Sequence, residues 1–251
     1  MKTPNMPGIA CYPVEFMVAC GICQVRPEVF LQQFVNHIYY SSIFFETRSK
    51  IEFGVNVIIY RNFMEHLDRL PLAKDKALHV ICKEQLDEII DDPATAESTK
   101  RDLLVPVLKK FREAICQDPD QVSQINLPNG CKLKLNDSLI MICFLYGMLP
   151  EQIIKGLIDN ISITMLYAEG KPLSDGGNHE MEVFYRITDG LFASSRELDK
   201  TNHATYDAMM TELYEKMKEE LDVDVKYQRF KVQFRKWHNT LKHIEIKPIV
   251  L

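Results

Sequence analysis

The chain has 251 residues, with 30 lysines and arginines against 35 aspartates and glutamates, which gives a formal net charge of −5. Its hydrophobic fraction of 46% and charged fraction of 26% are those of an ordinary folded protein and exclude a disordered chain. The length excludes a small scaffold that depends on disulfides, and the acidic balance argues against a protein that binds DNA mainly through its overall charge.

The glycine content favours helices over strands. Only 10 glycines are present, about 4% of the chain against an average near 7%, whereas many-stranded barrels and sandwiches use glycine at most of their turns. We therefore expect a mainly α protein, a multi-helix globular domain with at most one small β-hairpin near 124–135. A single helical domain over 1–251 is the favoured organisation, and two subdomains meeting near 118–136 are the alternative.

Three helices are predicted in the first third of the chain. Pro27 suits the first turn of a helix and begins one whose apolar face includes Phe30 and Phe34. Apolar residues at helical spacing predict two more helices, over 55–70 and 72–90.

The next predicted helix is capped by Ser98 and runs through Ile115. Pro106 lies inside this pattern and lacks a backbone N–H group. We therefore expect a kink or a late helix start at this position.

A β-hairpin is predicted between the helices. Residues 125–127 and 131–135 alternate between apolar and polar side chains on either side of Asn129-Gly130, a dipeptide that favours a tight turn. Its alternative is an extended loop. Asn136 or Asp137 then caps a helix that runs to Met148.

Further helices fill the rest of the chain. Pro150 begins a helix predicted to continue through Met165. The turn-rich residues 170–178 predict a mobile loop. Three more helices are expected near 178–194, 202–222 and 226–243.

Standard catalytic and cofactor motifs are absent from the sequence. It contains no P-loop, dinucleotide-binding glycine motif, nucleophile elbow, H-E-x-x-H zinc helix or Glu-x-x-His pair. Because these chemistries need their groups at fixed spacing, we expect no cofactor and favour a protein that is not an enzyme.

The cysteines predict a reducing compartment. The chain has seven, several of them among aliphatic residues, as is typical of free thiols in a cytoplasmic protein. Cys20 and Cys23 form a C-x-x-C pair that could supply half of a metal site. No second pair lies nearby, so two ordinary buried thiols are the favoured interpretation. The longest apolar run, 139–149, is too short for a transmembrane segment.

The candidate catalytic pair is His179-Glu180, which directly follows the turn-rich stretch. A general base beside a pocket covered by the 170–179 loop would have this pattern. A helix that begins here with Asn178 as its cap has the same pattern, and it is the favoured interpretation.

The C-terminal segment has the most informative pattern. An interaction seam with spacings of three and four residues is formed by Tyr227, Phe230, Phe234, Trp237 and Leu241. Basic residues are interleaved with it, among them Arg229, Lys231, Arg235, Lys236 and Lys242.

Several structures fit this segment. The acidic residues 203–224 precede it, so the favoured structure is an antiparallel helical hairpin in which the two seams meet and opposite charges flank them. Residues 223–234 also alternate with period two, which leaves a strand as an alternative.

Three functions remain open. The favoured one is a non-enzymatic interaction or regulatory protein that acts through a helical surface on a protein partner or on a second copy of itself. The alternative is nucleic-acid binding by the basic C-terminal residues. The third is a small-molecule sensor or enzyme with a pocket near the 170–179 loop.

Overall fold

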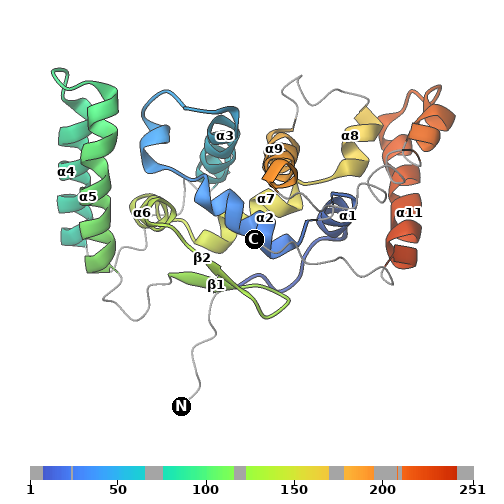
Figure 1. Cartoon of the computed structure of the whole chain (residues 1–251), viewed down its shortest axis with the longest axis horizontal. Coiled ribbons are helices and arrows are strands. Elements are labelled where there is room, and N and C mark those ends of the chain that lie inside the picture. The colour runs from blue at the N-terminus through green and yellow to red at the C-terminus, as the bar shows by residue number, and fades with distance from the viewer. Residues whose placement is uncertain are drawn as a thin grey trace, which may run out of the picture. The chain divides into compact units, whose positions relative to one another are not determined.

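The computed structural model describes residues 8–23, 25–65, 76–115, 123–169, 178–194, 208 and 211–241, and it is mainly α-helical with one small hairpin, as predicted (Figure 1). The elements of the first half are α1 (Val14–Ile22), α2 (Pro27–Asn36), a 3-10 turn (Tyr40–Ile43), α3 (Lys50–Glu65), α4 (Lys76–Asp91) and α5 (Glu97–Ile115). Those of the second half are β1 (Gln124–Asn126), β2 (Lys132–Lys134), α6 (Asp137–Tyr146), α7 (Pro150–Asp159), α8 (Ile163–Glu169), α9 (His179–Ser194) and α11 (Val223–Leu241).

The backbone divides into two compact units. Unit 1 comprises Met1–Ala10 and Gln32–Gly156, and unit 2 comprises Cys11–Leu31 and Leu157–Leu251. Compactness does not establish independent folding, so the single domain over 1–251 and the alternative boundary near 118–136 both stay predictions.

Helix α6 forms the core of unit 1. Six of its ten residues are buried, and all six belong to its continuous apolar run. The predicted cap is Asn136, whose Oδ1 accepts a hydrogen bond from the N–H of Leu139 at 2.8 Å. The helix ends two residues earlier than predicted because Gly147 adopts a left-handed conformation, with φ of +64°. The N–H of Gly147 donates a hydrogen bond to the carbonyl of Cys143.

The predicted hairpin is confirmed, and its inner face joins the same core. Ile125 pairs with Leu133, and both side chains are buried. The turn includes Gly130, whose φ of +78° is a conformation that residues other than glycine rarely adopt. Gln32 of α2 exchanges two hydrogen bonds of 3.1 Å with the backbone of Lys134, which fixes the edge of β2.

Side chains bonded to distant backbone groups hold unit 1 together. The amide nitrogen of Asn136 donates to the carbonyls of Val35 at 2.6 Å and Ile38 at 2.9 Å. Lys100 donates to Ile90 at 2.6 Å, at the end of α4, and Arg101 donates to a carbonyl of the 44–49 loop. The bonds to Val35 and Ile90 satisfy carbonyls in the last turns of α2 and α4, which these helices leave without internal partners, and the other two reach carbonyls of loops.

Two predicted boundaries in unit 1 change. Helix α5 begins at Glu97, so Ser98 lies inside the helix and is not its cap. The turn before α5 is held instead by Asp92, whose carboxylate accepts from the N–H of Ala94 at 2.9 Å. Helix α3 begins at Lys50, five residues before the predicted start, because Ser49 accepts from the N–H of Glu52 in the manner of a capping box.

An aromatic cluster forms the core of unit 2. The Phe30 ring of α2 lies 4.8 Å from Phe184 of α9 and 5.8 Å from Phe16 of α1, and all three side chains are fully buried. No helix was predicted before Pro27, so α1 is an addition to the expected elements. Its Glu15 carboxylate accepts from the hydroxyls of Ser162 and Thr164, which ties α1 to the start of α8.

The helix predicted from Pro150 through Met165 is wrong in its second half. Helix α7 ends at Asp159, and α8 begins at Ile163. The Ser162 hydroxyl accepts from the N–H of Met165 at 3.1 Å and so starts the new helix. Further along the chain, α9 follows the prediction for 178–194, whereas residues 170–177 lie outside the described part.

Within the described residues, no single helix has both the length and the apolar composition needed to cross a membrane. Helices α6 and α7 meet both requirements only as a pair, and the chain bends by 102° between them. The apolar side chains of α6 are buried in the core of unit 1.

Candidate interaction surface

The C-terminal segment is a helix, and the alternative of a strand is wrong. Asp222 sets the helix start, since its Oδ1 accepts from the N–H groups of Asp224 at 2.9 Å and Val225 at 3.2 Å. Helix α11 therefore begins three residues earlier than predicted. With about 100° of rotation per residue, its side chains divide into an inner and an outer face.

The inner face of α11 packs against α8 and α1 (Figure 1). Phe230 is fully buried, and its ring lies 6.2 Å from that of Tyr167 in α8. Tyr227 is half-buried beneath Lys231, whose ammonium lies 5.0 Å from the ring centroid. Two members of the predicted seam are thus engaged within unit 2. Phe234, Trp237 and Leu241 continue the helix, and their side chains lie outside the described part.

The acidic segment before α11 makes ion pairs within itself. Residues 211–217 are helical, so the helix predicted over 202–222 ends five residues earlier than expected. Residues 202–207, 209 and 210 lie outside the described part. Glu212 pairs with Lys216, and Glu215 pairs with Lys218. The segment contacts α11 through Met217, whose sulfur lies 3.7 Å from a guanidinium nitrogen of Arg229.

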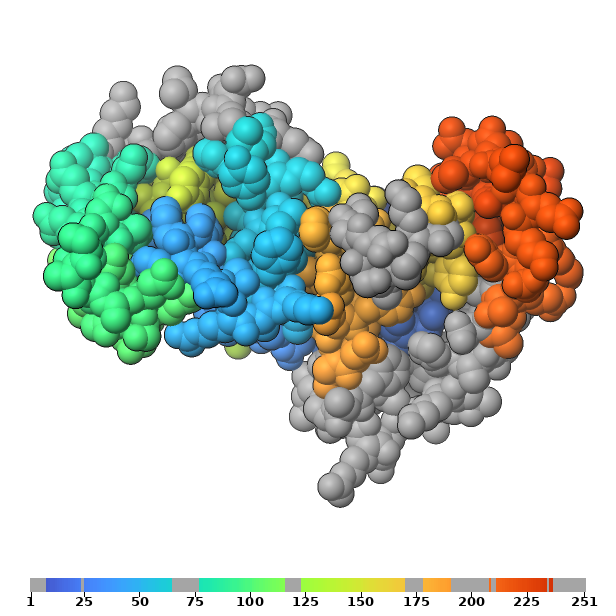
Figure 2. Space-filling model, turned by 90° about the horizontal axis from the view of Figure 1, so that it is seen from above, coloured from blue at the N-terminus to red at the C-terminus, as the bar shows by residue number. Residues whose placement is uncertain are grey.

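The outer face of α11 is basic and exposed, and the red end of the chain in Figure 2, which includes this helix, lies at the surface. Arg229, Arg235 and Lys236 are exposed, and Lys231 is half-buried against Tyr227. Lys242, the last basic residue of the predicted set, lies outside the described part. The exposed side chain of Val232 (55%) lies between the basic residues. Sequence reasoning missed this valine because it does not belong to the aromatic seam. Its angular position on the helix, away from the seam, could have predicted that it is exposed.

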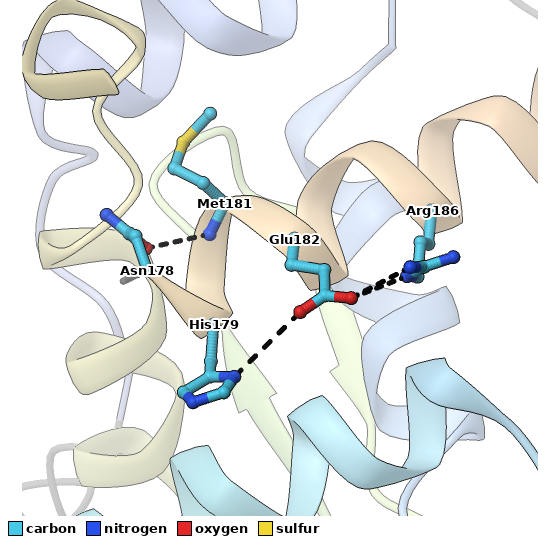
Figure 3. A network of polar contacts seen from close by, with 5 residues as sticks. All are labelled: Asn178, His179, Met181, Glu182 and Arg186. Atoms are coloured by element: carbon cyan, nitrogen blue, oxygen red, sulfur yellow. Dashed lines mark hydrogen bonds and ion pairs between the residues drawn. The ribbon is translucent and has the colours of Figure 1, made fainter. Parts of the chain in front are cut away.

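The start of α9 holds the candidate catalytic residues (Figure 3). Asn178 caps the helix by accepting from the N–H of Met181 at 2.9 Å, and it donates to Asn160 at 3.3 Å. The favoured interpretation of this stretch was a capped helix start, and the capping bond agrees with it.

His179 lies beside Glu182 rather than beside its neighbour in sequence. Its Nδ1 is 3.9 Å from a carboxylate oxygen of Glu182, and the other oxygen of that carboxylate accepts two hydrogen bonds from Arg186, at 2.8 and 3.0 Å (Figure 3). Glu180 is almost completely buried. The three residues at positions 179, 182 and 186 therefore form a ladder along one side of α9, an arrangement that also stabilises ordinary helices.

The C-x-x-C pair lies at the end of α1, and both thiols are buried. Burial raises the pKa of the Cys20 thiol, and it raises the pKa of Cys23 to about 12 even though a hydrogen bond with Thr188 acts in the opposite direction. Metal binding and disulfide exchange both need the thiolate. Among the described residues, no group of three or more histidine, cysteine or acidic side chains could hold a metal ion.

No known protein family matches this chain, and neither a curated protein nor a solved structure is significantly similar to it. A function for the chain must therefore follow from the chemistry of its own surfaces. Of the residues singled out in the sequence, the basic ones of α11 are those that the structure leaves at the surface in a continuous group.

Proposed function

We propose that this protein is a non-enzymatic interaction protein and that the outer face of α11 binds an acidic, amphipathic segment of a protein partner. One observation carries the proposal: an exposed valine lies between two basic flanks. Val232 is 55% exposed. Arg229 and Lys236 lie on one side of it, and Lys231 and Arg235 lie on the other.

This arrangement suits a helical partner with apolar residues in the middle and carboxylates at the edges. Flanking charges of this kind choose partners and directions in helix pairs. Each exposed ion pair contributes only about 0–1 kcal/mol, and burial of a valine adds about 1.5 kcal/mol or more. We therefore expect a weak, salt-sensitive association with a dissociation constant of about 0.1 mM or higher.

A protein partner is favoured over a nucleic acid because of where the aromatic side chains lie. Base stacking needs exposed rings, but Phe230 is fully buried and Tyr227 is covered by Lys231. Of the seam's aromatic residues, the two whose side chains the structure describes offer no exposed ring to a base, and the chain carries a net charge of −5.

The test measures the binding of two fluorescent probes by anisotropy at low salt. One probe is a synthetic helical peptide with leucines along one stripe and glutamates beside it, and the other is duplex DNA of about 20 base pairs. We expect the peptide to bind and the double variant Arg229→Glu/Arg235→Glu to bind it at least about tenfold more weakly.

The matched control is Lys109→Glu/Lys110→Glu, which makes the same change of charge at two exposed positions of α5 and should leave peptide binding unchanged. Circular dichroism checks that both variants keep their helix content. Tighter binding of DNA than of the peptide would replace this proposal with the nucleic-acid function. Equal loss in the control, or no binding of the peptide, would overturn it.

A further inference from the structure

A second helix has the complementary outer face. In α4, residues 77, 80, 81, 84, 88 and 91 follow one another at helical spacing and lie along one side. Val80 and Ile81 are 51% and 48% exposed, and Glu84, Glu88 and Asp91 follow them, all exposed. Helix α4 thus presents an apolar first half and an acidic second half.

On this side of α4 the carboxylates outnumber the cations: Lys83 is exposed next to Glu84 but lies about 100° around the helix from it. Within the described residues, none of the three forms an ion pair, and the last turn of α4 contains no basic residue. Negative charge at a helix C-terminus opposes the helix dipole. Lys100 of α5 reaches the carbonyl of Ile90, but the outer side of α4 keeps its excess of negative charge. A cationic partner would relieve it.

Helix α11 matches this face in spacing as well as in charge. Val225 is followed by Arg229 four residues later and by Lys236 seven residues after that. In α4, Val80 is followed by Glu84 four residues later and by Asp91 seven residues after that. The intervals of four and seven residues are the same in both helices. The valines can therefore contact each other, and each acidic residue of α4 can contact a basic residue of α11, along three turns.

We propose that the partner of α11 is a second copy of this chain, which docks α4 on α11 with the two helices parallel. This inference rests on the proposed function in using the basic side of α11, and it makes the apolar contact at the half-buried Val225, whereas Val232 comes opposite Asp87. The parallel direction follows from the charges. It pairs Val80 with Val225, Glu84 with Arg229 and Asp91 with Lys236, whereas the antiparallel direction that keeps the Glu84–Arg229 pair would bring Asp91 against Asp222.

The contact is heterologous, because one copy contributes α4 and the other contributes α11. Each copy then keeps one free face of each kind, so association continues beyond a dimer unless the arrangement closes into a ring. The average mass in solution should therefore rise steadily with concentration between about 10 and 500 μM and fall when the salt is raised, because exposed charges are screened.

The experiment is sedimentation equilibrium of the full chain and of two charge-reversed variants. Glu84→Lys/Asp91→Lys makes α4 basic, and Arg229→Glu/Lys236→Glu makes α11 acidic. Each variant alone should associate at least about tenfold more weakly than the original chain. An equimolar mixture should associate again, because the unchanged α11 of the first meets the unchanged α4 of the second. Lys109→Glu/Lys110→Glu is the control and should associate as the original chain does.

The mixture separates contact between copies from contact within one copy, since only the former can be restored by mixing. Single reversals test the register: Glu84→Lys mixed with Arg229→Glu should associate more strongly than Glu84→Lys mixed with Lys236→Glu.

Three results would overturn the inference: a monomer at every concentration, no recovery in the mixture, or normal association of the α4 variant. If Arg229→Glu/Arg235→Glu still weakens binding of the acidic peptide in any of these cases, the proposed function stands and only the choice of partner fails.

Discussion

Each unit has a buried apolar core, but in the described residues unit 1 has more hydrogen bonds from side chains to the backbone of distant elements than unit 2 has. In unit 2, three phenylalanines from α1, α2 and α9 contact one another in the core. In unit 1, side chains such as Asn136, Lys100 and Gln32 bond to backbone groups of other elements. Apolar contacts are not directional and tolerate changes of shape, whereas a hydrogen bond fails when its donor is removed. We therefore expect a conservative substitution to cost little stability in the aromatic cluster of unit 2 and more stability at a hydrogen-bonding side chain of unit 1.

The largest effect is expected in the aromatic cluster. Phe30→Ala removes a fully buried ring and should lower the free energy of unfolding by about 3–5 kcal/mol. Phe30→Leu keeps most of the volume and should cost less than about 1.5 kcal/mol. Urea titration followed by circular dichroism measures both losses. Equal losses in the two variants would show that ring contacts, rather than buried volume, hold this unit.

A smaller loss of stability is expected when the hydrogen bonds that the Asn136 amide donates in unit 1 are removed. Asn136→Asp keeps the oxygen that caps α6 but removes the two donors to Val35 and Ile38 and places a carboxylate against their carbonyls. The loss should be about 2–3 kcal/mol in urea titrations followed by circular dichroism.

Asn178→Asp is the matched control for that substitution. It makes the same change at the cap of α9, where the amide donates a single exposed bond of 3.3 Å and the helix N-terminus favours negative charge. It should cost less than about 1 kcal/mol. Equal losses at the two caps would mean that the ties to Val35 and Ile38 do not stabilise unit 1.

The smallest effect should be the same in both units. Burial raises the pKa of Cys23 in unit 2 and of Cys82 in unit 1 from 9.0 to about 12. Both thiols therefore stay protonated in the folded chain after the unfolded chain has begun to lose the proton. Their contribution is complete below pH 9 and is lost as the pH rises toward 12, at about 1 kcal/mol for each thiol between pH 9 and 10.

Urea titrations between pH 8 and pH 10.5 measure this loss. Cys23→Ala and Cys82→Ala should each reduce, by the same amount, the slope with which the free energy of unfolding falls as the pH rises. A slope that stays unchanged in one variant would show that water reaches that thiol in the folded protein.

Local signals in the sequence predicted much of the fold. The apolar run of α6, the Asn129-Gly130 turn and the cap Asn178 are where they were expected, and of the two residues proposed as the cap of α6 the structure has Asn136. Each depends on residues within a few positions of one another, and short-range sterics and hydrogen bonds decide them. Ser98 was assigned wrongly because a serine inside the first turn and a serine at the cap look alike in sequence.

The candidate surface was predicted only in part. The basic residues of α11 were identified, but the seam beside them was offered as an interaction surface, and Tyr227 and Phe230 lie inside unit 2. Spacing shows that a helix has an apolar face but not what covers it. The outer stripe around Val232 could be located only after α8 and α1 had taken the inner face.

The sequence by itself determined the helical class, the hairpin and the starts of α2, α6, α7 and α9, because backbone geometry, capping and apolar periodicity act over a few residues. The tertiary structure decided which side chains meet across the chain. The bonds between Asn136 and Val35, the cluster around Phe30 and the exposure of the acidic side of α4 and the basic side of α11 all depend on it. The physical reason is that burial belongs to the packed assembly of elements, and no single element contains the information that fixes it.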